Sequence, residues 1–234
     1  MVDDLDTVAR YAMALGFSIR NRTVLVEGTT DADLFHLAAR LEHEAGRPDL
    51  LGNDLAIVPA GERDLGGASG VIRELVGLRC VARTCLLPNG NPRYRFIGLF
   101  DNDKAGRQAV YTLRHIDTSI LEYKDVFRIW PVMPCPQNLD PTSMQKIFES
   151  ENGLYKGMEW ELEDMLNPDF VRAFEAEYPD AVTRTFPVEG RVHRVFTWDG
   201  KARLHRFVKQ HAMRSDLAGV VEVLKAIRFY LRLK

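Results

Sequence analysis

The residues of this chain most able to do chemistry are acidic side chains that follow two apolar runs, residues 23–26 and 96–100. These acids are Glu27, Asp31, Asp101 and Asp103. Short runs of Val, Ile, Leu and Phe bounded by Gly, Asn and Asp are typical of buried strands in a parallel sheet. In open α/β sheets, ligands bind at the carboxyl ends of such strands. If the two strands are neighbours, four like charges crowd one small volume, and a hard divalent cation with oxygen ligands would relieve their repulsion.

These two stretches resemble the signature of the Toprim domain, which is found in topoisomerases, bacterial primases, ribosomal-RNA maturases and OLD-type nucleases. One strand of that signature ends in Glu-Gly, here Glu27-Gly28, and a later strand ends in Asp-x-Asp, here residues 101–103 followed by Ala105-Gly106. A third stretch, residues 55–64, looks like the second strand and glycine-rich turn of the same fold. The chain is most similar to the Toprim nuclease domain of the OLD (overcoming lysogenization defect) family, over residues 22–132 and more loosely beyond them.

The resemblance implies an α/β fold, a Rossmann-like parallel sheet of about four strands flanked by helices, with a C-terminal helical and hairpin extension. We divide the chain into an N-terminal helix (residues 1–21), a Toprim core (22–132) and an extension (133–234) that completes the nuclease domain with an acidic helix and a basic helical region.

The resemblance also implies roles for individual residues. It makes Glu27, Asp101 and Asp103 catalytic and assigns them, with Asp31, to the binding of Mg²⁺ or Mn²⁺. Glu163 is our choice for a later acid that completes the metal site in OLD-type enzymes. A competing interpretation of Asp103 is that it caps a helix, and of Glu163 that it belongs to a solvated acidic helix. The roles of the neighbouring acids Glu159, Glu161 and Asp164 stay open.

A catalytic lysine is implied in the same way. Lys201 lies where the family supplies a lysine to the transition state, and a cation there would stabilise developing negative charge. A competing interpretation is that Lys201 is an ordinary lysine at the start of a helix. Lesser candidates for phosphate contact are Arg203, Arg206, Lys209, Lys104 and Arg107. Cationic residues are frequent throughout residues 184–234, which fits either a phosphate-binding flank or a solvated basic face.

Composition sets the class of protein. The 234 residues are 46% hydrophobic and 27% charged with a net charge of −2, as in soluble globular proteins. No apolar run approaches the roughly 20 residues that span a bilayer, and the acidic start differs from a signal peptide, so we expect a cytoplasmic protein that does not bind membranes. The three cysteines form no metal-ligand pattern. The sequence contains no Gly-x-x-x-x-Gly-Lys-Ser/Thr motif, which would be the sign of an ATPase domain.

The remaining pattern predicts alternating strands and helices, and hence βαβ units. Helices are expected at residues 4–16, from an N-cap at Thr30, near 71–76, at 106–115, at 158–166 and at 201–211. Further strands are expected at 55–60, 126–132 and 192–198, the last followed by a turn at Asp199-Gly200. Residues 80–87 and 94–100 flank Asn89-Gly90 and predict a hairpin. Residues 134–156 read as an irregular connection with a short helix near 144–148.

We therefore expect a divalent-metal-dependent nuclease that hydrolyses DNA or RNA. By analogy with the family it would be the effector of an antiphage defence system that works with a separate ATPase partner. Two alternatives are a structured-RNA maturase-like ribonuclease and a non-catalytic module that docks to a partner ATPase. The strandedness of the substrate, the number of metal ions and the oligomeric state, including a homo-oligomer, stay open.

Overall fold

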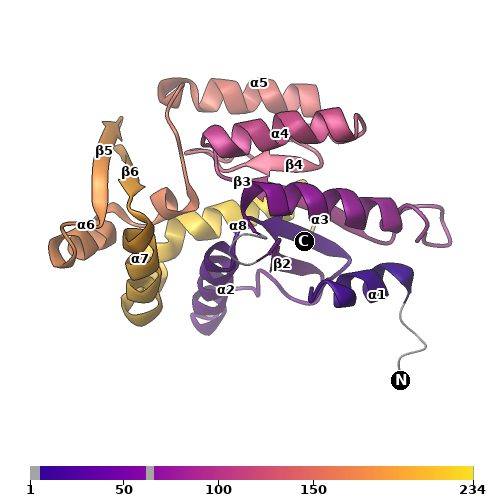
Figure 1. Ribbon diagram of the computed structural model, residues 1–234, viewed down its shortest axis with the longest axis horizontal. Helices are drawn as coiled ribbons and strands as arrows, with labels where there is room; N and C mark the ends of the chain where they lie inside the picture. The colour runs from indigo at the N-terminus through magenta and orange to yellow at the C-terminus, as the bar shows by residue number, and fades with distance from the viewer. Residues whose placement is uncertain (1–5, 62–65, 234) are drawn as a thin grey trace.

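The computed structural model of the chain describes residues 6–61 and 66–233 (Figure 1). Predictions that fall on residues 4–5, on 62–64 or on Lys234 lie outside this part. The elements that precede the extension are α1 (Thr7–Ala14), β1 (Arg22–Val26), α2 (Thr29–Glu44), β2 (Leu55–Pro59), α3 (Gly67–Ala82), β3 (Arg95–Phe100), α4 (Lys104–Ile116) and β4 (Val126–Arg128). The elements of the extension are α5 (Pro141–Glu151), η2 (Gly153–Tyr155), η3 (Leu162–Met165), α6 (Pro168–Glu177), β5 (Val182–Val188), β6 (Arg191–Phe196), α7 (Trp198–His211), η4 (Arg214–Leu217) and α8 (Ala218–Tyr230).

The predicted α/β fold with a four-stranded parallel sheet is confirmed. The strand order is β2-β1-β3-β4, and Leu25 of β1 lies between Val58 of β2 and Gly98 of β3. From β1 the chain passes through α2 to one edge of the sheet, whereas from β3 it passes through α4 to the opposite edge. The carboxyl ends of β1 and β3 therefore flank a topological switch point, where α/β sheets open a crevice for ligands.

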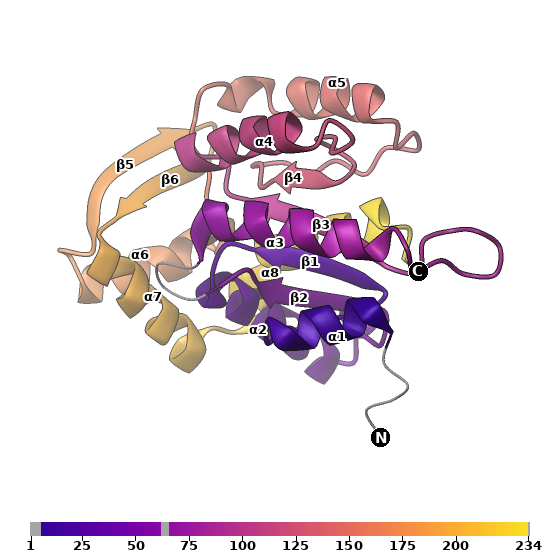
Figure 2. The same cartoon turned by 45° about the vertical axis from the view of Figure 1, so that its right-hand side comes forward.

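Successive side chains of a strand point to opposite faces of the sheet, so the strands contribute to two hydrophobic cores, one on each face. Val24 and Val26 of β1 pack in one core with α2 and α8, whereas Leu25 packs in the other with α1, α3 and α4. Figure 2 shows α3 and α4 on one face of the sheet, with α8 passing behind it. The first core also contains Phe148 of α5 and Leu204 of α7. Because the extension shares a core with the sheet, it can hold its own residues at the sheet edge.

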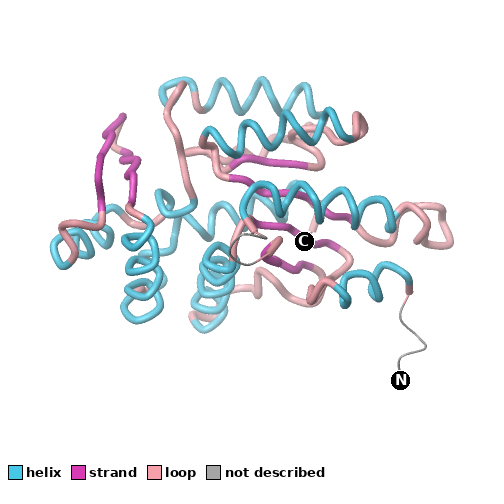
Figure 3. The backbone as a smooth tube through the Cα atoms, in the orientation of Figure 1, coloured by secondary structure: helices cyan, strands magenta, loops and turns pink. Residues whose placement is uncertain are grey.

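The hairpin of the extension stands apart from the main sheet. β5 and β6 pair antiparallel, and the backbone tube shows them beside α7 at the end of the molecule where β1 and β3 terminate (Figure 3). Within the extension, the start of α6 is joined to η4, because Asn167 N–H donates to Asp216 O at 2.9 Å. Within the described residues, no helix is long and apolar enough to cross a membrane.

Several local predictions are wrong. The strand predicted at 80–87 is replaced by the end of α3 and a single bridge between Leu86 and Pro92, because Leu75, Leu78 and Ala82 bury one helical face. The irregular connection contains a full helix, α5, which begins at Pro141 after Asp140 accepts hydrogen bonds from two backbone N–H groups.

Four other elements differ from their predicted type or bounds. The acidic helix predicted at 158–166 is only the 3-10 turn η3, preceded by extended backbone at Glu161. The predicted turn at Asp199-Gly200 is the first turn of α7, which Thr197 caps by accepting from Gly200 N–H. The fourth strand ends at Arg128 rather than 132, and the strand predicted at 192–198 spans Arg191–Phe196.

Candidate functional site

Glu27 and Asp101 lie side by side at the carboxyl ends of β1 and β3, because these two strands are adjacent and parallel. This end of the sheet is called the sheet edge below. Glu27 Oε1 accepts a hydrogen bond from the backbone N–H of Asp101 at 3.2 Å. The backbone of one strand end therefore fixes the carboxylate of the other. This contact meets the condition on which the sequence-based site depended, namely that the two strands are neighbours.

Asp31 lies in the first turn of α2, directly after β1. Its Oδ2 accepts from Gly28 N–H at 2.9 Å, so Gly28 rather than the predicted Thr30 is the N-cap position. A carboxylate in this turn also benefits from the helix dipole. Asp31 is thereby held next to the end of β1.

Asp103 has the helix-capping role that was the competing interpretation of this residue. Its Oδ1 accepts from Gly106 N–H at 2.7 Å and starts α4. Gly106 is required here because a Cβ on it would collide with the carbonyl oxygen of Asp101. Asp103 keeps one carboxylate oxygen outside this capping bond.

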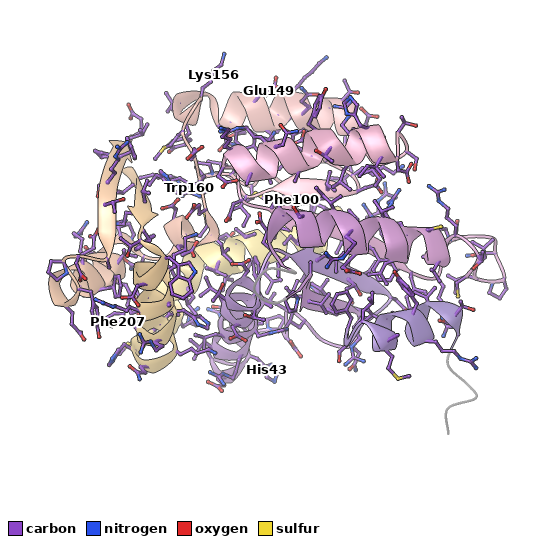
Figure 4. The ribbon with its side chains drawn as sticks, in the orientation of Figure 1. His43, Phe100, Glu149, Lys156, Trp160 and Phe207 are labelled. Carbon is purple, nitrogen blue, oxygen red and sulfur yellow. The ribbon has the colours of Figure 1, made fainter. Side chains whose placement is uncertain are left out.

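The middle residue of the Asp-Asn-Asp stretch anchors the extension. Asn102 is buried, its N–H donates to Trp160 O at 2.8 Å, and its Oδ1 accepts from Arg128 at 2.7 Å. The strand end is thus bound to the segment that leads into the acidic turn. Figure 4 labels Trp160 on this segment, which runs down past the sheet edge near Phe100.

The acidic turn completes the cluster. The backbone N–H of Leu162 donates to Asp101 Oδ1 at 2.9 Å, so η3 lies directly on the strand end. Lys201 of α7 reaches into the turn, with Nζ 2.8 Å from Glu161 Oε2 and 3.4 Å from Glu163 Oε1. The other carboxylate oxygen of Glu163 is buried and has no hydrogen-bond partner among the residues that the structure describes.

Asp164 holds the acidic turn in place. Its carboxylate accepts from Glu161 N–H at 2.9 Å, from His193 Nδ1 at 2.7 Å and from Arg194 N–H at 3.1 Å. Only 1% of the Asp164 side chain and 5% of the His193 side chain are exposed. Although burial lowers the pKa of His193, the Asp164 carboxylate outweighs this effect and raises it. The β5–β6 hairpin therefore supports the turn through a buried ion pair.

Crowding of negative charge perturbs the acids. Burial, with the nearby Asp103 and Glu161 charges, raises the pKa of Glu27 to about 7. Burial and the Glu163 charge raise the pKa of Asp31 to about 7 and that of Asp101 well above its usual value. Burial would lower the pKa of Lys201, but the surrounding carboxylates raise it instead. The site thus carries an excess of carboxylates over the single ammonium group.

The donor set fits a hard divalent cation. All the acids offer oxygen, and Mg²⁺ and Mn²⁺ favour carboxylate and water ligands. The unpartnered oxygen of Glu163 and the raised pKa values of three carboxyl groups are what a missing positive charge would produce. Across residues 6–61 and 66–233, no group of three His, Cys, Asp or Glu side chains has the arrangement of a metal site. The fit therefore rests on charge and ligand type.

The structure brings together Glu27, Asp31, Asp101, Glu163 and Lys201, and places Asp103 at the margin as a cap. Sequence reasoning left Glu161 unassigned, although it makes the shorter contact with Lys201. It missed the roles of Asn102, Asp164 and His193. A hint was available for Glu161 alone, because it shares an acidic run with Glu163.

Much of the basic region predicted as a phosphate-binding flank is paired within the chain. Its ion pairs are Arg194 with Glu175, Arg203 with Asp180 and Asp199, Lys209 with Asp33, Arg214 with Glu42, Lys225 with Glu222 and Arg228 with Asp54. Arg107, another candidate phosphate contact, pairs with Glu159 at 3.2 Å. Lys201 is the predicted cation that lies directly among the site acids.

No protein-family model, curated protein or solved structure matches this chain.

Proposed function

We propose that this chain is a divalent-metal-dependent phosphodiesterase that cleaves nucleic acid. The observation that carries the proposal is the convergence of carboxylates from three separate segments, the end of β1 with α2, the end of β3 and the η3 turn, on one switch point beside Lys201. Buried acids with raised pKa values at a strand edge are typical of functional sites, because a purely structural role would not favour such repulsion.

Four carboxylates would hold Mg²⁺ or Mn²⁺: Glu27, Asp31, Asp101 and Glu163. A divalent ion bound there would supply positive charge to the scissile phosphate and make water a better nucleophile. The chain's own contribution is positioning, because Asp101 N–H orients Glu27 and Leu162 N–H orients Asp101. Lys201 would stabilise the negative charge that develops on the phosphate. Asp103 keeps an oxygen with which it can support the site from the start of α4.

The predicted partner and setting follow from the same proposal. An unrestrained nuclease is harmful to its host, so control by a separate ATPase in a cytoplasmic defence system suits this chemistry. Co-purification of the tagged chain from its natural source, followed by identification of bound proteins, would test the partner.

The decisive experiment is a cleavage assay on plasmid, linear duplex and single-stranded DNA and structured RNA, with Mg²⁺, Mn²⁺ or EDTA. Glu27→Gln and Asp101→Asn keep the shape of each side chain and remove its charge. Glu149→Gln, an exposed acid of α5, is the matched control (Figure 4). We expect metal-dependent products that fall at least about 100-fold in both site variants and persist in the control.

Cleavage that survives both site substitutions would refute the assignment. Absence of cleavage by the wild-type chain, alone and with its co-purified partner, would favour the non-catalytic docking module. The preferred substrate in the panel would separate a DNA nuclease from a maturase-like ribonuclease.

A further inference from the structure

A cavity of about 280 Å³ opens directly beside the acid cluster. One side of it is formed by Asp31, Glu163 and Lys201 of the site. The rest is largely apolar and comes from α2, the residue after η3, and α7, with Leu34, Leu166, Trp198, Ala202, Leu204 and Val208 among its lining. The pocket therefore joins a charged wall to an apolar wall.

Trp198 is the unusual residue of this pocket. It is 89% exposed, whereas Trp160 is only 1% exposed. It sits in the first turn of α7, a stable position because Thr197 caps the helix and Gly200 packs closely on the carbonyl of Ala181. An exposed indole contributes little to the core, but Trp198 adjoins the apolar lining of the pocket and so extends a contiguous apolar surface, the kind of surface that marks a binding site.

We propose that this pocket takes an unpaired nucleobase of a nucleic acid strand, with Trp198 as its stacking platform; the inference rests on the proposed function. The volume lies just below the roughly 300–1,000 Å³ of pockets for drug-sized ligands, and suits one planar ring system. Aromatic side chains stack on bases of any sequence because every base has a π-face.

The charged side of the pocket, with Lys201 among its residues, favours a base that carries a phosphate. Lys201 lines the pocket with 38% of its side chain exposed, and its ammonium group pairs with Glu161 and Glu163. A base seated against Trp198 and Leu204 would keep its attached phosphate toward Lys201 and the acids. The substrate implied is single-stranded, or a duplex from which one nucleotide is turned out, since a paired base cannot enter the pocket.

The test measures binding without cleavage. A fluorescein-labelled oligothymidylate of about 12 nucleotides is titrated with protein in EDTA and in Ca²⁺, and anisotropy gives the affinity. An abasic strand of equal length carries the same phosphates without bases, and the matching duplex presents no free base. In parallel, tryptophan fluorescence is measured with the unlabelled strand. Quenching that is lost in Trp198→Ala reports contact with Trp198, because Trp160, which is buried, and Trp130, which is half-buried, both remain in that variant.

Four variants sharpen the test. Trp198→Ala removes the platform at an exposed position and should weaken oligothymidylate binding about 5- to 100-fold, whereas Trp198→Phe should retain most of it. Ala202→Phe fills the pocket and should weaken binding with Trp198 still present. Tyr111→Ala removes another exposed aromatic side chain, on α4 away from the pocket, and should bind as the wild type does.

The inference is overturned if abasic strand or duplex binds as well as oligothymidylate, if Trp198→Ala leaves the affinity unchanged, or if no quenching occurs in either buffer. These outcomes are independent of the nuclease assay. Cleavage by a protein whose binding ignores Trp198 would leave the proposed function standing and remove the base pocket. Base-dependent binding by a protein that cleaves nothing would leave the base pocket standing and remove the proposed nuclease function.

Discussion

Removal of the Glu27 charge should stabilise the metal-free protein, although Glu27 is central to the proposed site. Burial raises the pKa of Glu27 from 4.5 to about 7, so its ionised form is disfavoured in the folded state. At pH values between these two pKa values, the folded chain binds more protons than the unfolded chain, so the free energy of unfolding falls as pH rises. The contribution of Glu27 to the free energy of unfolding is thus fully present below about pH 4.5 and is lost as the pH rises through about 7.

The magnitude follows from the same values. The difference between about 7 and 4.5, at 1.36 kcal/mol per pH unit, corresponds to roughly 3 kcal/mol at pH 8. Glu27→Gln keeps an oxygen that can accept from Asp101 N–H and avoids the charge. We expect the variant to unfold roughly 6 to 12 °C above the wild type at pH 8, and to differ by less than about 1 kcal/mol at pH 5.

Urea and thermal denaturation of both proteins in EDTA, from pH 5 to 8, would measure this effect. Glu149→Gln should follow the wild type within about 0.5 kcal/mol because that acid is exposed. Mg²⁺ at pH 8 should raise the melting temperature of the wild type more than that of Glu27→Gln, since only the wild type gains a ligand charge. The reasoning is refuted if Glu27→Gln is no more stable than the wild type at pH 8, or if the two proteins have the same pH dependence.

Two other substitutions test how the site is built. Asp164→Asn should destabilise the chain by about 3 kcal/mol in urea denaturation, because it leaves the buried His193 without its charged partner; an effect below about 1 kcal/mol would mean that the pair does not hold the acidic turn. Gly106→Ala, which in an ordinary helix would be neutral or stabilising, should destabilise by about 1 kcal/mol or more and lower metal-dependent cleavage, since the new methyl group meets the Asp101 carbonyl. Gly153→Ala has open space around it and is the control for that comparison.

The location of the strand-end acids could be predicted because the geometry of parallel sheets is local and repetitive. Each apolar run had to end at the same edge, so Glu27 and Asp101 were brought together once β1 and β3 paired. The role of Asp103 was also within reach, since an Asp before a helix is a common cap. The strand at 80–87 was mistaken because short apolar alternation does not distinguish a strand from the last turn of a buried helix.

The support for the acids could not be predicted, because it depends on contacts between distant segments. Asp164 and His193 are separated by 29 residues, and Asp101 and Leu162 by 61. No periodicity links such pairs. The acidic run at 159–164 resembled a solvated helix because its charges are dense, whereas its backbone turns onto the sheet and places Glu161 and Glu163 on either side of Lys201.

The extension is therefore part of the site rather than an addition to a complete core. Without it, Asp101 would lose the Leu162 N–H, and the acids would lose the ammonium group of Lys201. Carboxylates buried together at a cost in stability persist only when the surrounding structure over-determines them. Here the determining contacts are backbone N–H groups from β3, α2 and η3, which hold the acids at one edge whatever their charge state. This burial of like charges, which raises the pKa of Glu27, Asp31 and Asp101, is the basis on which we propose that the acids are positioned to bind a cation.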